Sequence, residues 1–168
     1  GRTDNTLGPV YGKQWHNFGG VDQLKNLLAE IKSNPDSRRL IVSAWNPIEM
    51  DDMALPPCHY GFQVYINDGV IDLMWQQRSV DIFLGLPYDI AMYGLLLEFL
   101  AKGNGLKAGS LIGQLGDCHL YSNHIKQASE QLERYMHELP TISVEHGLYL
   151  DNDAIFMPVH NSVSLNNY

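Results

Sequence analysis

The sequence predicts an α+β protein in which β-strands pack against helices. Segments with helical periodicity alternate with β-rich runs, and one segment near the middle is almost continuously apolar. A hairpin signal joins two of the β-rich runs. With 168 residues, of which 45% are apolar, the chain can bury one core, so we expect a single domain over residues 1–168.

Charge and cysteine content narrow the classes of function. A formal charge of −8 and a pI of about 5.2 argue against binding of polymeric nucleic acid, because phosphate binding requires clustered Lys and Arg. One small phosphorylated ligand needs only a few arginines and is compatible with this charge. The two cysteines are too few for a disulfide scaffold, and no apolar run reaches the ~18 residues of a membrane span. We therefore expect a cytoplasmic protein without membrane contact.

The first quarter of the chain is predicted to hold a loop, a helix and a strand. Residues 1–20 are rich in glycine and polar residues, which predicts a loop. A helix is predicted from its N-cap Asp22 to the stop at Asn34-Pro35. Its apolar positions have helical spacing and are Leu24, Leu27, Leu28 and Ile31. The β-rich run 40–45 then predicts a buried strand.

A β-hairpin is predicted around Asn67-Asp68-Gly69. Residues 59–66 alternate in polarity and the return strand covers 70–79. The alternation places four side chains on one face, namely Tyr60, Phe62, Val64 and Ile66. In an antiparallel pair of this register, the ends that carry Cys58 and Arg78 meet, so a thiol and a guanidinium become neighbours.

The second half of the chain continues the alternation of helices and strands. Asp89 is predicted as the N-cap of a helix that runs through Leu100 and is buried nearly all round. Residues 108–116 are predicted to form a strand, and 121–135 a second amphipathic helix. From Pro140 onward, we expect short strands and turns.

Cys58 lies in a proline-stiffened turn, Leu55-Pro56-Pro57-Cys58-His59, and is the candidate nucleophile. The thiolate is the reactive form of cysteine, and a nearby guanidinium favours it by charge attraction. The candidate cations are Arg78, Arg38 and Arg39. The alternative for Cys58 is a small buried apolar residue, which is the commonest fate of a free cysteine, and adjacent arginines are commonly just a solvated turn.

The spacing of the cysteine, histidine and glycine residues does not match the signatures of several other kinds of site. Neither Cys58-His59 nor Cys118-His119 has the spacing that lets side chains converge on zinc, so we expect no metal. The nucleobase deaminase signature lacks its second cysteine, and no P-loop or Rossmann glycine pattern is present. A cysteine protease that pairs Cys58 with His119 or His124 lacks a local signature.

Ordered motifs along most of the chain resemble one enzyme family. They are LGPVYGKQW at 7–15, SRR at 37–39, SAWNP at 43–47, PPCH at 56–59, QRS at 77–79, Asp81, FLGLP at 83–87, GD at 116–117 and HLYSNH at 119–124. In this order they resemble thymidylate synthases, from Leu7 to about Leu132. This resemblance favours the nucleophile interpretation of Cys58 over the buried apolar one.

The resemblance implies a thymidylate synthase-like fold, in which a mixed β-sheet packs against helices. It also implies transfer of a one-carbon unit from 5,10-methylenetetrahydrofolate to C5 of a pyrimidine deoxynucleoside monophosphate. Cys58 would add to C6 as a covalent nucleophile. The candidate catalytic residues are Cys58, Gln77, which would lie beside the base, and Asp81. Asp81 is also placed in the folate site, where Leu84, Gly85 and Tyr88 would line the pocket.

The remaining implied contacts hold the nucleotide. Arg78 and Ser79 would bind the phosphate, and Arg38 and Arg39 would reach it from the other subunit of a sheet-mediated homodimer. Forked guanidinium donors suit a phosphate dianion. The 3′-hydroxyl of the deoxyribose would be bound by His119 and Tyr121.

Asp89 is the most informative departure from the thymidylate synthase pattern, which carries Asn at this position. An Asn amide pairs with O4 and N3 of uracil, whereas cytosine presents an amino donor and an N3 acceptor. A carboxyl group accepts from the amine and, when protonated, donates to N3. Deoxycytidylate hydroxymethylases resemble this chain in carrying Asp there, so we expect dCMP as the substrate.

The sequence leaves alternatives for the reaction product and for how much of the enzyme this chain represents. An exocyclic methylene at C5 either takes up water to give hydroxymethyl-dCMP, which we favour, or takes hydride to give a methyl group; exclusion of water decides between them. The first alternative is a dCMP methylase or an ordinary thymidylate synthase that methylates dUMP. The family's upstream catalytic glutamate and C-terminal tail are not found, so we expect an N-terminal part and a C-terminal tail to be missing. A non-catalytic nucleotide- or RNA-binding remnant is the alternative of another class.

Overall fold

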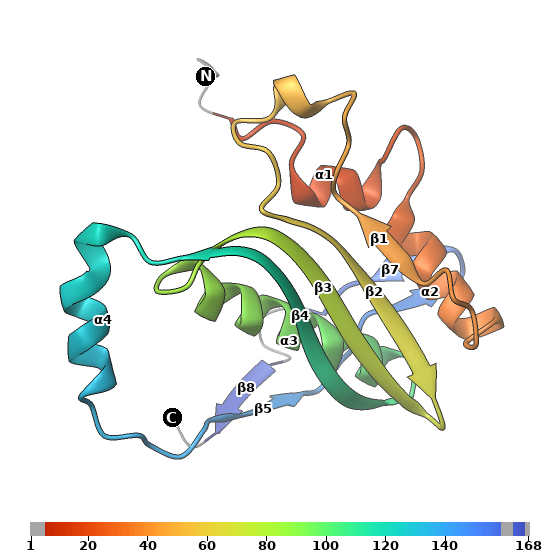
Figure 1. Cartoon of the computed structure of the whole chain (residues 1–168). Coiled ribbons are helices and arrows are strands. Elements are labelled where there is room, and N and C mark those ends of the chain that lie inside the picture. Colours follow the sequence, from red (N-terminus) through yellow and green to blue (C-terminus); the bar gives the residue numbers. More distant parts are fainter. Residues whose placement is uncertain (1–5, 159–162, 167–168) are drawn as a thin grey trace.

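A four-stranded mixed sheet forms the centre of the computed structural model, which describes residues 6–158 and 163–166 (Figure 1). Its strands, in spatial order, are β1 (Ile41–Ser43), β2 (His59–Asn67), β3 (Val70–Asp81) and β4 (Lys107–His119). The β1–β2 and β2–β3 pairs are antiparallel and the β3–β4 pair is parallel. The α+β class with a mixed sheet is therefore confirmed.

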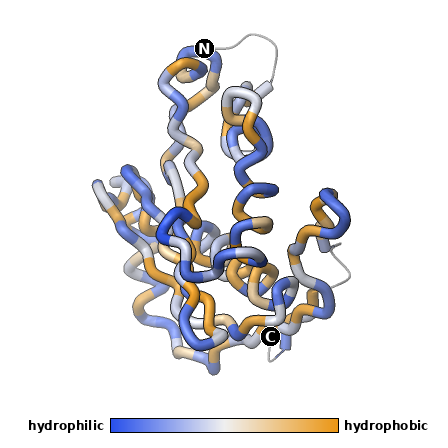
Figure 2. Tube along the Cα trace, turned by 90° about the vertical axis from the view of Figure 1, so that its right-hand side faces the viewer, coloured by the Kyte–Doolittle hydropathy of each residue, from blue (hydrophilic) through white to orange (hydrophobic). Residues whose placement is uncertain are grey.

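Two helices cover one face of this sheet and close the core. Helix α2 (Gln23–Ser33) packs beside β1, and α3 (Gly85–Gly103), which connects β3 to β4, packs against both of these strands. The predicted N-cap of α2 is confirmed, because the Asp22 carboxylate accepts a hydrogen bond of 2.9 Å from the Lys25 N–H. The hydrophobic and hydrophilic stretches that alternate along the trace in Figure 2 reflect this one-sided burial. The core includes Leu28, Val42, Phe62, Val64, Leu73, Tyr93, Leu97 and Leu100.

The predicted hairpin between β2 and β3 is present, but one residue interrupts its alternation. Asp68 and Gly69 have φ of 49° and 75°, the left-handed values that a two-residue hairpin turn requires. A β-bulge lies between His59 and Gly61, so two residues of β2 oppose one of β3. Phe62 faces the core as predicted, whereas Tyr60 is exposed; the prediction for Tyr60 was wrong because sequence alternation does not reveal a bulge.

Helix α3 begins earlier than predicted and is less enclosed. It starts at Gly85, so Asp89 is its fifth residue and not its N-cap. Pro87 fits because the first N–H groups of a helix have no partner within the helix. Ile90 and Met92 are 46% and 37% exposed, so burial nearly all round is also wrong for the described chain. The apolar composition of this segment does not reveal which of its side chains remain uncovered in the described chain.

Two further differences concern the helices outside the core. The predicted loop over 1–20 contains the short helix α1 (Tyr11–His16). The second amphipathic helix, α4 (Ile125–Leu132), is shorter than predicted and stands apart from the sheet (Figure 1). It follows the 3-10 turn η2 (Ser122–His124), and a second such turn, η1 (Met50–Asp52), precedes β2.

The C-terminal segment forms short strands, as predicted. Strand β5 (Thr141–Val144) pairs with β8 (Val163–Asn166), and β6 (Tyr149–Asp151) pairs with β7 (Ala154–Phe156). The ion pair between Lys25 and Asp153, 2.8 Å, ties the β6–β7 hairpin to α2. Within residues 6–158 and 163–166, no helix has the length and apolar character needed to cross a membrane.

Candidate functional site

The hairpin joins Cys58 to Arg78, as the sequence predicted. The Arg78 N–H donates to the Cys58 carbonyl oxygen at 2.9 Å. The guanidinium donates to two carbonyls of the turn that precedes the thiol, from Nε to Pro57 at 2.9 Å and from Nη2 to Pro56 at 3.1 Å. It also lies 5.8 Å from the centre of the Trp45 ring. Arg78 therefore holds the turn that presents Cys58 and keeps its other N–H groups near the surface.

Tyr11 is a site residue that the sequence reasoning missed. Its hydroxyl oxygen accepts a 3.0 Å hydrogen bond from the Cys58 N–H, and its ring stacks on His59 with centroids 4.0 Å apart. Burial raises the pKa of Tyr11, and nearby negative charge, including that of Asp89, adds to this effect. The signal was available in the LGPVYGKQW motif, but the prediction of a loop gave Tyr11 no fixed position.

A polar network fixes α1 and therefore Tyr11. Gln14 is fully buried; its Nε2 donates to Glu49 Oε2 at 2.8 Å, and its Oε1 accepts from Asn46 at 3.0 Å. Lys13 forms an ion pair with the same carboxylate. The hydrogen bonds from Lys13 first, and then from Gln14, hold the pKa of Glu49 below its usual value. This network ties the helix to the loop that leads to Cys58.

A second set of contacts links His59 to Asp89 through three intervening side chains. His59 Nδ1 lies 2.8 Å from the Tyr93 hydroxyl, and the Tyr93 ring stacks on Trp75 with centroids 5.5 Å apart. The Trp75 indole N–H donates to Gln77 Oε1 at 3.1 Å, and Gln77 Nε2 donates to Asp89 Oδ2 at 2.7 Å. Gln77 and Asp89, two predicted site residues, are thus in direct contact.

Burial controls the protonation of the two rings in this chain of contacts. It lowers the pKa of His59, although the charge of Asp89 opposes this shift. It raises the pKa of Tyr93 far above its ordinary value, and there the charge of Asp89 acts in the same direction. His59 is therefore neutral near pH 7, and Tyr93 keeps its proton.

The ends of β3 and β4 bring the next group of predicted residues together. Asp81 is the register partner of His119, and the Ile82 N–H donates to the His119 carbonyl at 3.0 Å. The edge of the Tyr121 ring meets His119 at a centroid distance of 5.0 Å. The Asp81 carboxylate accepts hydrogen bonds from the Phe83 and Leu84 N–H groups and so shapes the entry to α3.

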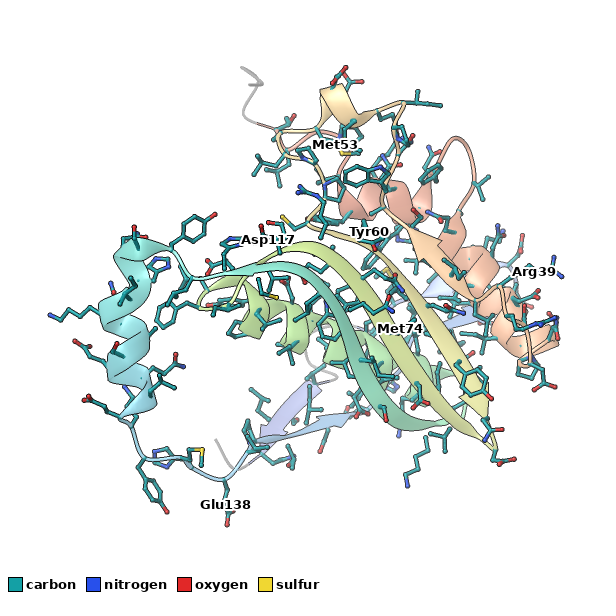
Figure 3. All side chains as sticks on the ribbon, viewed as in Figure 1. Arg39, Met53, Tyr60, Met74, Asp117 and Glu138 are labelled. Atoms are coloured by element: carbon teal, nitrogen blue, oxygen red, sulfur yellow. The ribbon has the colours of Figure 1, made fainter. Side chains whose placement is uncertain are left out.

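Arg38 and Arg39 lie elsewhere. They line a surface hollow of about 320 Å³ together with Asn34, Asp36 and Ser37. Figure 3 shows Arg39 beside α2, well away from Asp117 at the end of β4. Among the three predicted cations, Arg78 is therefore the one that the described chain brings to Cys58.

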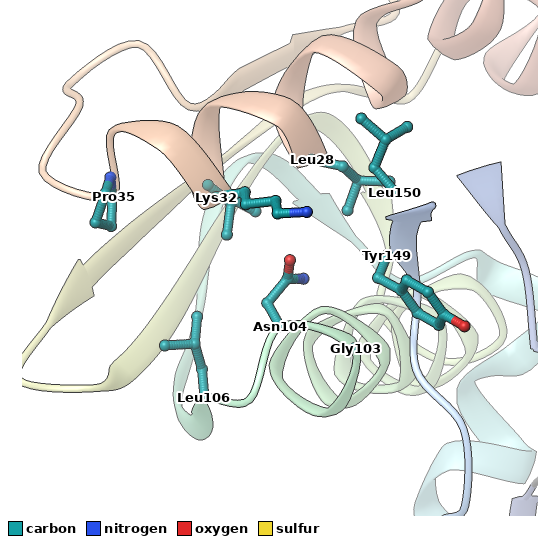
Figure 4. A pocket seen from close by; sticks show the side chains of 9 residues that line it. Leu28, Lys32, Pro35, Gly103, Asn104, Leu106, Tyr149 and Leu150 are labelled. Carbon is teal, nitrogen blue, oxygen red and sulfur yellow. The ribbon is translucent and has the colours of Figure 1, made fainter. Parts of the chain in front are cut away.

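The hollow in Figure 4 is separate from the predicted site. It has a volume of about 380 Å³ and lies between α2, the end of α3 and β6, with Leu28, Asn104 and Tyr149 among its lining residues. No predicted site residue lines it. In the part of the chain that the structure describes, no group of three or more His, Cys, Asp or Glu side chains is arranged to hold a metal ion.

Comparison with known proteins identifies the family. The family model for thymidylate synthase matches residues 2–168. The chain belongs to the thymidylate synthase family. A solved structure, the thymidylate synthase of T4 phage, is similar to this structure with a TM-score of 0.82 and 42% sequence identity, over 96% of this chain and 59% of that chain. The predicted thymidylate synthase-like fold is thereby confirmed.

Curated relatives carry the same family name. The chain is 57% identical over 143 residues to a probable thymidylate synthase of Escherichia phage T5, which is 84% of this chain and 51% of the relative. It is 55% identical over 136 residues to the thymidylate synthase of Mycoplasma pneumoniae, which is 81% of this chain and 47% of the relative. The chain thus spans about half the length of these relatives.

Proposed function

We propose that the protein is a folate-dependent enzyme that converts dCMP to 5-hydroxymethyl-dCMP. Membership of the thymidylate synthase family supports one-carbon transfer to C5 of a pyrimidine nucleotide. The preference for dCMP rests on the resemblance, which implies that Asp89 reads the base, and one observation supports it: the Asp89 carboxyl group is anchored by Gln77 within a network that begins beside Cys58. We propose residues 1–168 as one catalytic domain.

The chemistry begins with the Cys58 thiolate, which forms a bond to C6 of the base and makes C5 a carbanion equivalent. When bound, 5,10-methylenetetrahydrofolate supplies the one-carbon unit that C5 attacks. Loss of the C5 proton, together with cleavage of the carbon–nitrogen bond that releases tetrahydrofolate, would leave an exocyclic methylene on the nucleotide. Water adds to this methylene, its proton is released, and the Cys58 thiolate departs from C6, which restores the ring and the enzyme.

The predicted folate contacts offer a suitable surface. Leu84 and Tyr88 at the start of α3 are 49% and 77% exposed, so an aromatic ring system can cover them. Asp81 lies at the same end of the sheet, and a Cβ added to Gly85 would lie 3.5 Å from its Cβ. We propose that these four residues bind the folate and that Asp81 and Gln77 act with Cys58 in catalysis.

Arg78 and Ser79 are the proposed phosphate contacts within one subunit, and His119 with Tyr121 the proposed contacts to the 3′-hydroxyl. Because Arg38 and Arg39 lie away from Cys58 in their own chain, we propose that they reach the phosphate in the partner subunit of a homodimer. Guanidinium groups bind phosphate bidentately, which gives these arginines a chemical reason to converge there. A cytoplasmic location is consistent with the two free cysteines, Cys58 and Cys118.

Ordinary dUMP methylation is the second candidate, because the relatives are named thymidylate synthases. One experiment separates the candidates: the full-length protein is incubated with 5,10-methylenetetrahydrofolate and either dCMP or dUMP, and the nucleotide product is weighed by mass spectrometry. We expect a hydroxymethyl product from dCMP. A methyl product from dCMP contradicts only the choice of water over hydride. Turnover of dUMP alone contradicts the use of Asp89, and binding without turnover of either nucleotide supports the non-catalytic alternative.

The covalent step has its own control pair. Cys58→Ala is expected to abolish the covalent nucleotide adduct and turnover while nucleotide binding persists, because the phosphate contacts do not involve the sulfur. Cys118→Ala changes the other, exposed thiol and is expected to leave the adduct intact. An adduct that survives Cys58→Ala, measured as the mass of the intact protein, contradicts the proposed nucleophile.

A further inference from the structure

Gln77 is buried and has a protein partner for each polar end of its side chain. Its Oε1 accepts from the Trp75 indole at 3.1 Å. Its Nε2 donates to the Ser79 carbonyl at 3.1 Å and to Asp89 Oδ2 at 2.7 Å. With 3% of its surface exposed, Gln77 has its hydrogen-bonding capacity largely used by the protein itself.

These partners permit only one orientation of the Gln77 amide. An indole N–H is only a donor and a backbone carbonyl is only an acceptor. Rotation of the amide by 180° would set the Gln77 Nε2 against the Trp75 N–H and its Oε1 against both the Ser79 carbonyl and the Asp89 carboxylate. The Trp75 indole and the Ser79 carbonyl therefore both favour the orientation in which Asp89 receives a hydrogen-bond donor.

The position of the Trp75 indole is itself built into the sheet. Trp75 is 4% exposed, and its ring lies flat against that of Tyr93. Gly113, its register partner in β4, also borders the indole ring. A Cβ added to Gly113 would lie 2.6 Å from both Cζ2 and Cη2 of the indole, which is too close for any packed pair. The absence of a side chain at position 113 makes the space that Trp75 fills.

We propose that Trp75 is a specificity-determining positioning residue, which acts through Gln77 to decide which oxygen of Asp89 can carry a proton toward the substrate. Gln77 keeps Oδ2 as an acceptor. Among the described residues, no side chain donates to Oδ1, so the proton of the neutral acid belongs there. Oδ1–H would then donate to N3 of cytosine while Oδ2 accepts from the amino group. This inference rests on the proposed dCMP specificity and assigns Trp75, acting through Gln77, as its structural basis.

The test compares the same Trp→Phe substitution at two positions. Trp75→Phe keeps an aromatic ring on Tyr93 but removes the indole N–H, so Gln77 Oε1 loses its donor and the amide is held only by Ser79 and Asp89. We expect the ratio of kcat/KM for dCMP to that for dUMP to fall about 10-fold or more, the effect of one misdirected buried hydrogen bond. Trp15→Phe is the control, because Trp15 packs edge-on against Phe62 and its indole makes no hydrogen bond to the described residues. An unchanged ratio in Trp75→Phe overturns the proposal.

A double substitution separates positioning from simple packing. Gln77→Met removes the amide at similar volume and is expected to lower the same ratio. If Trp75 acts through Gln77, adding Trp75→Phe to Gln77→Met lowers the ratio no further. Additive effects would assign Trp75 a packing role and overturn the proposal. Gln77→Met alone also carries the test if Trp75→Phe does not fold, and a ratio equal to that of the wild type then counts against it.

A substrate-free measurement distinguishes failure of this inference from failure of the proposed function. In the wild type, the Gln77 side-chain amide protons are expected to be protected from exchange with solvent, and in Trp75→Phe this protection is expected to fall, because Gln77 Oε1 has lost its donor, as followed by NMR of the full chain. Reduced protection in a protein that turns over only dUMP would reject the dCMP proposal and keep the positioning role. Equal protection in both proteins rejects the positioning role itself.

Discussion

At the scale of single residues, Gln77 and the proposed base-reading residue Asp89 form one hydrogen-bonded unit. An amide at position 89 would present a donor and an acceptor to the base, whereas the carboxyl group presents acceptors and, when neutral, one donor. Gln77 donates to Oδ2, so the proposed contact with the base would be made by a carboxyl group that is already oriented. A substitution at either position is therefore expected to change how this carboxyl group is presented.

The first residue-scale prediction concerns this unit. Asp89→Asn is expected to move substrate preference toward dUMP by about 10-fold or more, because the amide matches the O4 and N3 edge of uracil. The measurement is kcat/KM for both nucleotides in the full-length protein. Asp151→Asn, a substitution of an exposed aspartate in β6, is the matched control. A preference that does not move contradicts edge reading by position 89.

The second residue-scale prediction concerns His59. Since burial lowers its pKa, the unfolded chain takes up a proton at higher pH than the folded chain does. The free energy of unfolding is therefore expected to fall as the pH drops below about 6.5, the ordinary histidine value, toward the lower folded pKa. Urea denaturation between pH 7.5 and 5 measures this slope.

His59→Gln is expected to reduce that slope, because the variant has no group that titrates in this range at position 59. His137→Gln changes an exposed histidine and is expected to keep the slope of the wild type. If both variants retain the full slope, the acid sensitivity has another origin.

At the scale of elements, the sequence predicted those features whose cause is local. Asp22 caps α2 through its own carboxylate, and Asp68-Gly69 turns the hairpin through its own backbone, so both were found. Helix α1 was missed because its six residues are stabilised by contacts with Glu49, 35 residues away from Gln14. The bulge at Tyr60 was missed because it depends on how β2 pairs with β3.

The same distinction holds for the site. Cys58 and Arg78 could be brought together from the hairpin register alone. Tyr11 and Trp75 could not, since their roles arise from tertiary contacts with Cys58 and Gln77. Trp75 and Gln77 do share a strand face at a spacing of two, but nothing in their sequence neighbourhood indicates that Asp89 lies beyond them.

An element-scale prediction tests the hairpin turn. Gly69 has a φ of 75°, and a Cβ added there would meet no heavy atom within 4 Å, so Gly69→Ala changes only backbone strain. We expect a loss of about 1 kcal/mol in the free energy of unfolding. Gly12→Ala also meets no atom within 4 Å but lies in α1, where alanine is the better helix former and a small gain is expected. Effects of equal sign in denaturant titrations would contradict this account.

At the scale of the whole molecule, the sheet has one covered and one open face. The open face carries exposed apolar side chains from three strands, Ile41, Tyr65 and Ile112, and Figure 3 shows Tyr60 and Met74 on the strands of this sheet. The proposed homodimer would cover this face. The same assembly would give Arg38 and Arg39 a phosphate to bind, so stability and activity would depend on one interface.

The whole-molecule prediction follows from that dependence. Ile112→Lys places a charge on the open face and is expected to weaken dimerisation by about 100-fold or more, because an unpaired buried charge costs several kcal/mol. Analytical ultracentrifugation of the full-length protein measures the mass. Leu132→Lys, at an 88% exposed position on α4, is the control and is expected to leave the dimer intact. A dimer that tolerates Ile112→Lys places the interface elsewhere.

The bulge in β2 interrupts the inward and outward alternation of side chains, so the residues before and after it alternate separately. Beyond Gly61 the side chains of Phe62, Val64 and Ile66 keep the ordinary alternation that seats them in the core, whereas the extra residue Tyr60 resets the alternation before Cys58. Deleting that one residue would change the phase of Cys58 and His59 together, so the His59 ring would leave its contact with Tyr93 while Phe62, Val64 and Ile66 stayed in register. The direction of the chain at Cys58 and the placement of the His59 ring are therefore set by the same unpaired residue.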